Sequence, residues 1–157
     1  MKYLDASAFV KRYRKEEQGS DEVNKLIENA REGNEQLMSS FLVVGEAVSV
    51  FDKWARYKYI SHNECTELIK IFLKDIKQLT DNEILVLEPV STSTITLCIE
   101  LIIQHHLSIN DSIHLYTALS NKNLIDQFIC SDELLLKAAK SEGFIVFNPE
   151  KEFDAAN

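Results

Sequence analysis

The sequence predicts an α/β protein built on a parallel sheet of about five strands that are joined by crossover helices. Short apolar runs alternate with longer helical segments along the whole chain, which is the pattern of repeated βα units. The short runs are apolar throughout, as expected for strands that helices cover on both faces. Gly (4) and Pro (2) are scarce, so long structureless loops are not expected.

The length and composition indicate a single domain that spans residues 1–157. A chain of 157 residues has the size of one ordinary domain, and no internal repeat, linker or charge block divides it. Hydrophobic residues make up 45% of the chain, so a core can form without disulfide or metal staples.

Each predicted strand is a short apolar run between two helical segments. The first run begins almost at the N-terminus and leads directly into Asp5. The predicted strands are Lys2–Leu4, Gln36–Ser39, Ile84–Leu87, Gln127–Cys130 and Phe144–Phe147.

Helices are expected to fill the intervals between these strands. Gly33 and Gly143 mark the ends of two of them, because glycine commonly follows the last turn of a helix. The predicted helices run from just after Asp5 to Arg14, over Ser20–Arg31, from after Ser40 to Tyr57, over Ser61–Leu79 and over Thr92–His105, and two more start near Asn110 and Ser131.

Composition argues against several functional classes. The net charge of -8 disfavours a broad nonspecific nucleic-acid binder, although it does not exclude an enzyme that acts on RNA. The three cysteines are widely spaced and form no CxxC pair, which suits reduced thiols in the cytoplasm. No apolar run of about 18 residues occurs and the N-terminus does not resemble a signal peptide, so no membrane association is expected.

Four acidic residues are expected to share one edge of the sheet. Asp5 and Asp132 each follow a predicted strand directly. Glu46 lies early in the helix after the second strand, and Asp111 begins a later helix. All four positions lie toward the carboxyl ends of the parallel strands, where α/β proteins bind their ligands.

Three of these acids also have a purely structural explanation. Asp5 can cap the first helix, and Asp132 beside Ser131 looks like an ordinary helix start. Ser108 and Asp111 have the spacing of a capping box. Glu46 differs, because it interrupts an almost wholly apolar stretch in which a carboxylate needs a cation, a salt bridge or an exit to solvent.

A divalent cation would account for a cluster of acids. Clustered carboxylates repel one another, and at least one would be driven to protonate without a cation. Mg²⁺ and Mn²⁺ prefer such oxygen ligands, and no set of His and Cys residues competes to make a zinc site. About two ions would neutralise roughly half of the excess charge, and they could activate water to cleave a phosphodiester.

Other acidic α/β enzymes fit this sequence less well. A haloacid-dehalogenase-like phosphatase requires Asp-x-Asp after the first strand and a DEDD-type exonuclease requires Asp-x-Glu, but position 7 is Ser. A response-regulator receiver requires an acidic pair before its first-strand Asp, where Lys2–Leu4 stands instead. A Gly-rich phosphate loop and a Walker motif are both missing from the sequence.

Four segments together resemble the motifs of PIN-domain ribonucleases of the VapC toxin type. The similarity extends from about Tyr3 to Pro149, which is nearly the whole chain. The matching segments are Tyr3–Lys11 (YLDASAFVK), Ser40–Glu46 (SFLVVGE), Asn110–Ala118 (NDSIHLYTA) and Ile129–Leu135 (ICSDELL), the last followed by Ala138, Ala139 and Gly143.

The resemblance implies a three-layer α/β/α sandwich, RNA cleavage that depends on Mg²⁺ or Mn²⁺, a homodimer, and a cognate antitoxin whose tail occupies the active-site groove. Ser7 would orient a carboxylate or a metal-bound water, and Ser131 keeps a hydroxyl where Thr is common. A solitary RNA-processing nuclease and a catalytically silent PIN-like binding module remain alternatives. By motif matching, the catalytic and metal-binding acids would be Asp5, Glu46, Asp111 and Asp132.

Three other groups of residues allow two interpretations each. His114 follows Asp111 by three residues and either lies near the acids or is a packed, hydrogen-bonded helical residue. The basic residues of Lys11–Lys15 could hold RNA phosphates or form a solvated helix face. Trp54, Tyr57 and Tyr59 could belong to the core or form a dimer or antitoxin surface, and the resemblance favours the surface.

Overall fold

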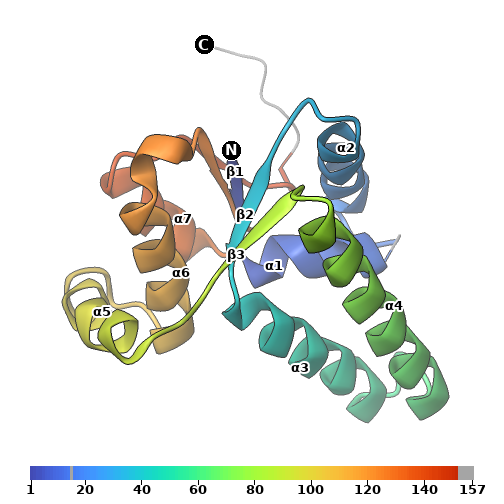
Figure 1. Ribbon diagram of the computed structural model, residues 1–157. Helices are drawn as coiled ribbons and strands as arrows, with labels where there is room; N and C mark the ends of the chain where they lie inside the picture. The colour runs from blue at the N-terminus through green and yellow to red at the C-terminus, as the bar shows by residue number, and fades with distance from the viewer. Residues whose placement is uncertain (15, 152–157) are drawn as a thin grey trace.

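The computed structural model describes residues 1–14 and 16–151 and contains one parallel five-stranded sheet. The strand order is β3-β2-β1-β4-β5, so the first strand lies in the centre (Figure 1). This arrangement confirms the parallel α/β fold expected from the sequence. The strands are β1 (Lys2–Leu4), β2 (Leu37–Ser40), β3 (Leu85–Glu88), β4 (Gln127–Ile129) and β5 (Val146–Phe147).

Helices cover both faces of the sheet and complete the expected three-layer α/β/α sandwich (Figure 1). None of the helices in the described ranges has the length and hydropathy needed to cross a membrane. One face packs against α1 (Ala6–Phe9), η1 (Val10–Tyr13), α2 (Ser20–Arg31), α3 (Leu42–Arg56) and α4 (His62–Asp81). The other face packs against α5 (Thr92–His105), α6 (Ile109–Ser120) and α7 (Glu133–Ser141). The short turn η2 (Lys122–Leu124) leads into β4.

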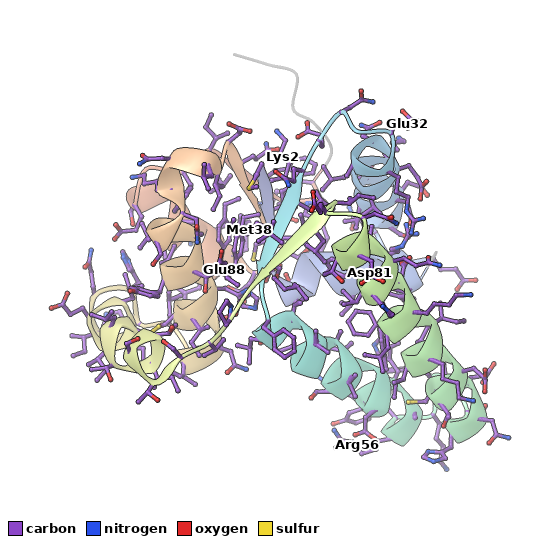
Figure 2. The ribbon with its side chains drawn as sticks, viewed as in Figure 1. Lys2, Glu32, Met38, Arg56, Asp81 and Glu88 are labelled. Carbon is purple, nitrogen blue, oxygen red and sulfur yellow. The ribbon has the colours of Figure 1, made fainter. Side chains whose placement is uncertain are left out.

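Alternating strand residues fill two separate cores, because successive side chains of a strand point to opposite faces of the sheet. Figure 2 shows Met38 on a central strand, surrounded by the side chains that fill the space between the layers. The side of α1 to α4 receives Leu4, Leu37, Leu85 and Ile129, and the side of α5 to α7 receives Tyr3, Met38, Phe128 and Cys130.

The structure departs from the predicted boundaries in two instructive places. The first predicted helix is split, since the chain tightens into the 3-10 turn η1 after Phe9. The last strand is shorter than predicted and begins at Val146. Gly143 has a φ of 87° and the Phe144 amide bonds to the Ala139 carbonyl, so Phe144 belongs to the C-terminal cap of α7 rather than to the sheet.

Candidate active site

The candidate site lies where the strand order reverses, at the carboxyl end of β1. The chain proceeds from β1 to β2 on one side of the sheet, whereas β4 pairs with β1 on the other side. The Asp5 amide directly after β1 donates to the Ile129 carbonyl at the end of β4, at 3.1 Å. A crevice at such a reversal is the usual ligand site of open α/β sheets.

Asp5 is the most deeply buried of the four acids, with 4% of its surface exposed. Its Oδ1 accepts hydrogen bonds from the Ala8 amide and the Ser7 hydroxyl, each at 2.9 Å, and its Oδ2 accepts one from the Cys130 thiol at 3.2 Å. Burial raises the pKa of Asp5, while the charge of His114 and these hydrogen bonds oppose that shift. Asp5 therefore caps the first helix, and Ser7 orients its carboxylate.

Asp132 reaches the same place from the end of β4. Its amide donates to the Cys130 sulfur at 3.1 Å, and its exposed carboxylate caps α7 by accepting from the Leu135 amide at 2.9 Å. The adjacent Ser131 amide donates to the Ser7 hydroxyl at 2.8 Å, which links the ends of β1 and β4. The Ser131 hydroxyl itself is buried and has no hydrogen-bond partner among the described residues.

Glu46 is held by a histidine. Its Oε2 lies 2.7 Å from Nε2 of His114, and its side chain is 20% exposed. The carboxylate within the apolar stretch thus has both a partner and access to solvent, as its position required. His114 is packed and hydrogen-bonded, and it also lies beside the acids, so both interpretations of this residue are correct.

Asp111 occupies the first turn of α6, one turn before His114. The Ser108 hydroxyl donates to its Oδ2 at 2.7 Å and accepts from its amide at 3.2 Å, so half of the predicted capping box forms and the carboxylate bonds to the Ser108 hydroxyl instead of the Ser108 amide. Residues three positions apart share a face of a helix, which places Asp111 on the side from which His114 reaches Glu46.

We call Asp5, Glu46, Asp111 and Asp132 the carboxylate edge. His114 is bonded to one of them, Glu46. Within residues 1–14 and 16–151, none of the four forms an ion pair with Lys or Arg. The same ranges contain no group of three or more His, Cys, Asp or Glu side chains already arranged to hold a metal ion. The described residues therefore contain no preformed metal-binding cluster at the carboxylate edge.

The chemistry of this edge fits a hard divalent cation. Its ligands are carboxylates, and a buried acid with a raised pKa gains from nearby positive charge. The buried, unpartnered hydroxyl of Ser131 stands beside Asp132 and indicates a further polar ligand at this point. Asp111 accepts a hydrogen bond from the Ser108 hydroxyl and Asp132 accepts one from the Leu135 amide, both at the starts of their own helices.

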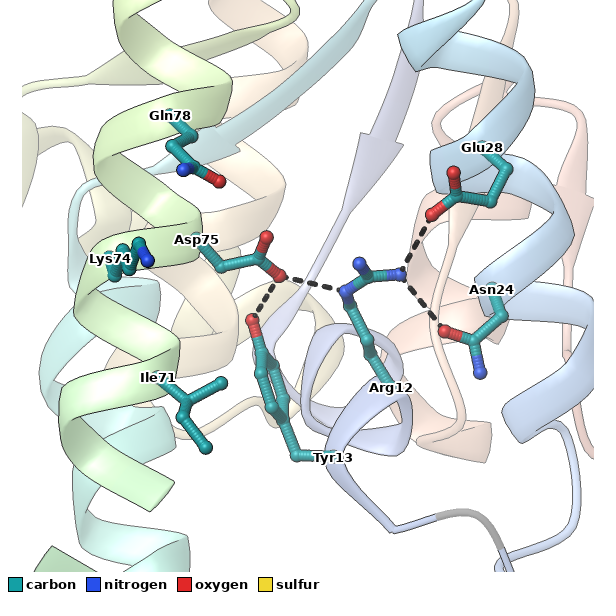
Figure 3. Close-up of a pocket in the computed structure, with 8 residues that line it drawn as sticks. All are labelled: Arg12, Tyr13, Asn24, Glu28, Ile71, Lys74, Asp75 and Gln78. Atoms are coloured by element: carbon teal, nitrogen blue, oxygen red, sulfur yellow. Dashed lines mark hydrogen bonds and ion pairs between the residues drawn. The ribbon is translucent and has the colours of Figure 1, made fainter. Parts of the chain in front are cut away.

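A second polar region lies between α2 and α4, around a hollow of about 670 Å³ (Figure 3). Asp75 accepts hydrogen bonds from Arg12 at 2.8 Å, from Tyr13 at 2.8 Å and from Arg31 at 2.6 Å. Burial and the charge of Asp75 raise the pKa of the Tyr13 hydroxyl. We call this region the Arg12 network, and it consists of Arg12, Tyr13, Asn24, Glu28, Arg31 and Asp75.

The basic run divides, since Lys11 is buried, Arg12 is half-buried and Arg14 is exposed. Lys11 is only 1% exposed and pairs with Glu17 at 3.2 Å and Glu150 at 2.6 Å. The guanidinium of Arg14 lies 5.4 Å from the ring centroids of both Trp54 and Tyr59. Lys11 and Arg12 therefore form internal ion pairs, Arg14 remains on the surface beside two aromatic rings, and Lys15 lies outside the described residues.

The three aromatic residues near the end of α3 differ in burial. Trp54 is buried and packs on Phe51, with ring centroids 5.4 Å apart, so its assignment to an interaction surface is wrong. Tyr57 and Tyr59 are exposed, and their rings are 6.3 Å apart. Trp54 belongs to the core, while the two tyrosines lie on the surface.

The sequence matches the PIN domain family model over residues 2–125, and the chain therefore belongs to the PIN domain family. No match was found among curated proteins.

Several solved structures share the fold. The structure of FitAB bound to an IR36 DNA fragment is 14% identical with a TM-score of 0.65, over 99% of this chain and 100% of that chain. VapC20 of Mycobacterium tuberculosis, a sarcin–ricin loop cleaving toxin, is 16% identical with a TM-score of 0.60, over 92% and 97%. PAE2754 from Pyrobaculum aerophilum is 17% identical with a TM-score of 0.60, over 92% and 89%. At these identities the similarity shows the fold.

Proposed function

We propose that this protein is a metal-dependent endoribonuclease, the cytoplasmic toxin of a toxin–antitoxin pair, with its active site at the carboxylate edge. The observation that carries the proposal is the surplus of acid at the strand-order reversal. Asp5 and Asp132 lie at the ends of β1 and β4, Glu46 is bonded to His114, and within the described ranges no Lys or Arg pairs with any of the four acids. The family membership and the fold shared with the VapC20 toxin support this assignment.

The residues of the carboxylate edge would each contribute to binding the cation. Asp5, Glu46 and Asp111 would hold Mg²⁺ or Mn²⁺, with Asp132 as a fourth ligand. A bound divalent cation supplies positive charge that stabilises a phosphodiester under attack by water and lowers the pKa of water. Ser7 holds the Asp5 carboxylate in place and ties it to the Ser131 amide, which keeps the ends of β1 and β4 together.

The direct test is cleavage of structured RNAs with Mg²⁺, Mn²⁺ or EDTA. We expect cleavage that requires the cation in the wild type and no cleavage by Asp5→Asn. This variant keeps an oxygen to accept from the Ala8 amide, so the helix cap survives the loss of charge. Cation-dependent cleavage that persists in Asp5→Asn would refute the assignment of the site.

A catalytically silent PIN-like binding module is the second candidate function. The observation in its favour is that Asp5, Asp111 and Asp132 all take part in helix capping, so each has a structural role without catalysis. Growth on expression separates the possibilities. Arrest by the wild type but not by Asp5→Asn supports a toxin, cleavage without arrest supports a solitary RNA-processing nuclease, and neither effect supports the silent module.

We also propose that the protein is a homodimer and binds a cognate antitoxin. The outward side of α5 supports the dimer, because it exposes four large apolar residues and two copies can bury the same face around a two-fold axis. Light scattering should show a dimer that Ile99→Asp dissociates, and co-purification with the small protein of a neighbouring reading frame tests the antitoxin. The exposed apolar residues of α5 are Ile95, Leu97, Ile99 and Ile103.

A further inference from the structure

A continuous chain of buried hydrogen bonds leads from the sheet to the carboxylate edge. The Ser40 amide at the end of β2 donates to the Tyr3 hydroxyl at 3.1 Å. The same hydroxyl lies 2.9 Å from Nδ1 of His114, and Nε2 of His114 lies 2.7 Å from Oε2 of Glu46. Tyr3 and His114 are 0% and 1% exposed, so this chain is shielded from water.

Elementary donor rules apply at each end of this series of hydrogen bonds. A backbone amide only donates, so the Tyr3 oxygen accepts from Ser40. A carboxylate only accepts, so Nε2 of His114 is the donor to Glu46. Nδ1 of His114 faces the Tyr3 hydroxyl, so the end of β2, Tyr3 and His114 together place a donor against Glu46.

Packing holds both rings in the orientation that this chain requires. The Tyr3 ring stacks on Phe128 with centroids 5.0 Å apart and an interplanar angle of 11°. The His114 ring meets Tyr3 edge-on, with centroids 6.0 Å apart. Since neither ring is free to turn, the Nε2 proton has one fixed direction, and it holds the otherwise flexible Glu46 side chain on the inner side of α3.

We propose that Tyr3 and His114 are positioning residues that hold Glu46 in the orientation in which it binds a divalent cation. This proposal rests on the proposed function, because it concerns the same carboxylate edge. Oε1 of Glu46 has no hydrogen-bond partner among the described residues, so the fixed carboxylate keeps one oxygen available. Partners of this kind behind a metal ligand change metal affinity or activity by about 10- to 100-fold when they are removed.

Three variants test the chain at separate points. His114→Leu removes the donor to Glu46, whereas His114→Gln places an amide N–H where Nε2 was and should rescue. Tyr3→Phe keeps the ring on Phe128 but removes the hydroxyl that faces Nδ1 of His114. We expect the Mn²⁺ concentration for half-maximal stabilisation against heat to rise about 10- to 100-fold in His114→Leu, less in Tyr3→Phe, and within about threefold of wild type in His114→Gln.

A second readout needs neither metal nor RNA. In the metal-free protein, ¹⁵N NMR of the His114 imidazole should show a proton on Nε2, and Tyr3→Phe should change the ¹⁵N shift of Nδ1. A purely structural role would lower the melting temperature of the variants but leave the half-maximal Mn²⁺ concentration unchanged.

Failure of this proposal is distinguishable from failure of the proposed function. If the wild type binds Mn²⁺ and cleaves RNA but the variants bind Mn²⁺ equally well, the positioning role is overturned and the nuclease assignment stands. If Mn²⁺ does not stabilise the wild type, the proposed metal site and the positioning role fall together. If His114→Leu does not fold, Tyr3→Phe and the ¹⁵N spectrum of the wild type decide the outcome.

Discussion

The carboxylate edge and the Arg12 network are both polar regions of one small fold, but they differ in the balance of charge. In the Arg12 network, the guanidinium of Arg12 lies between Asp75 and Glu28 (Figure 3), and that of Arg31 pairs with the same two acids. At the carboxylate edge, His114 pairs with Glu46, and within the described residues no Lys or Arg pairs with any of the four acids. A balanced network fastens helices together, whereas a surplus of acid is an unfavourable arrangement that a cation would relieve.

The largest expected effect follows from removing charge at the edge. Asp5→Asn and Asp111→Asn should each lower RNA cleavage by about 100-fold or more, because electrostatic groups at a reacting centre contribute on this scale. Asp75→Asn in the Arg12 network should leave the rate per folded molecule unchanged. The measurement is the RNA cleavage rate divided by the folded fraction of each variant. An equal loss of activity in Asp75→Asn and Asp5→Asn would contradict this contrast.

Truncating an acid of the Arg12 network should affect the stability of the fold rather than the activity. Asp75→Ala leaves Arg12, Arg31 and the Tyr13 hydroxyl without their shared acceptor, so we expect a loss of about 2–3 kcal/mol in the free energy of unfolding. Lys74→Ala is the matched control, since this exposed residue lines the same hollow and should change stability by less than about 0.5 kcal/mol. Urea unfolding monitored by circular dichroism measures both, and a similar loss in the two variants would count against a structural brace.

The pH dependence of stability should reveal the strain at Asp5. Its pKa is raised in the folded protein, chiefly by burial, so the protonated form favours folding and this contribution disappears as pH rises through the folded pKa. In EDTA, the stability of the wild type relative to Asp5→Asn should therefore fall as pH rises above about 4, near the ordinary value for Asp. Parallel stability curves from acidic to neutral pH would contradict this expectation.

The smallest structural effect is expected at Asp132. Asn caps helices about as well as Asp, so Asp132→Asn should keep the bond to the Leu135 amide and change the unfolding free energy by less than about 0.5 kcal/mol. Any fall in Mn²⁺ affinity then reports the lost charge alone. Calorimetric titration with Mn²⁺ measures this, and an unchanged affinity would reduce Asp132 to a helix cap.

Local chemistry explains why much of the fold could be predicted from the sequence. The helix predicted over Thr92–His105 has the observed bounds, and a local capping box of Ser91 and Thr94 marks its start. The strands were correct to about one residue, except where the cap at Gly143 shortened β5. Asp5 and Asp132 could be placed at one edge because both follow parallel strands.

The remaining features depend on contacts between distant parts of the chain. Lys11 is buried because Glu150 reaches it from 139 residues away, and no local pattern indicates that pair. The bond between Tyr3 and His114 spans 111 residues and depends on how α6 packs on the sheet. Only the spacing between Asp111 and His114 indicated that this histidine faces the acids.

The most direct measurement of the central claim is the melting temperature with and without millimolar Mn²⁺ in three proteins. If the carboxylate edge binds the ion with a micromolar constant, the midpoint of the wild type should rise by several degrees. Asp5→Asn should show no rise, while Asp75→Asn should begin lower and rise as much as the wild type. No rise in the wild type, or an equal rise in Asp5→Asn, would contradict the account.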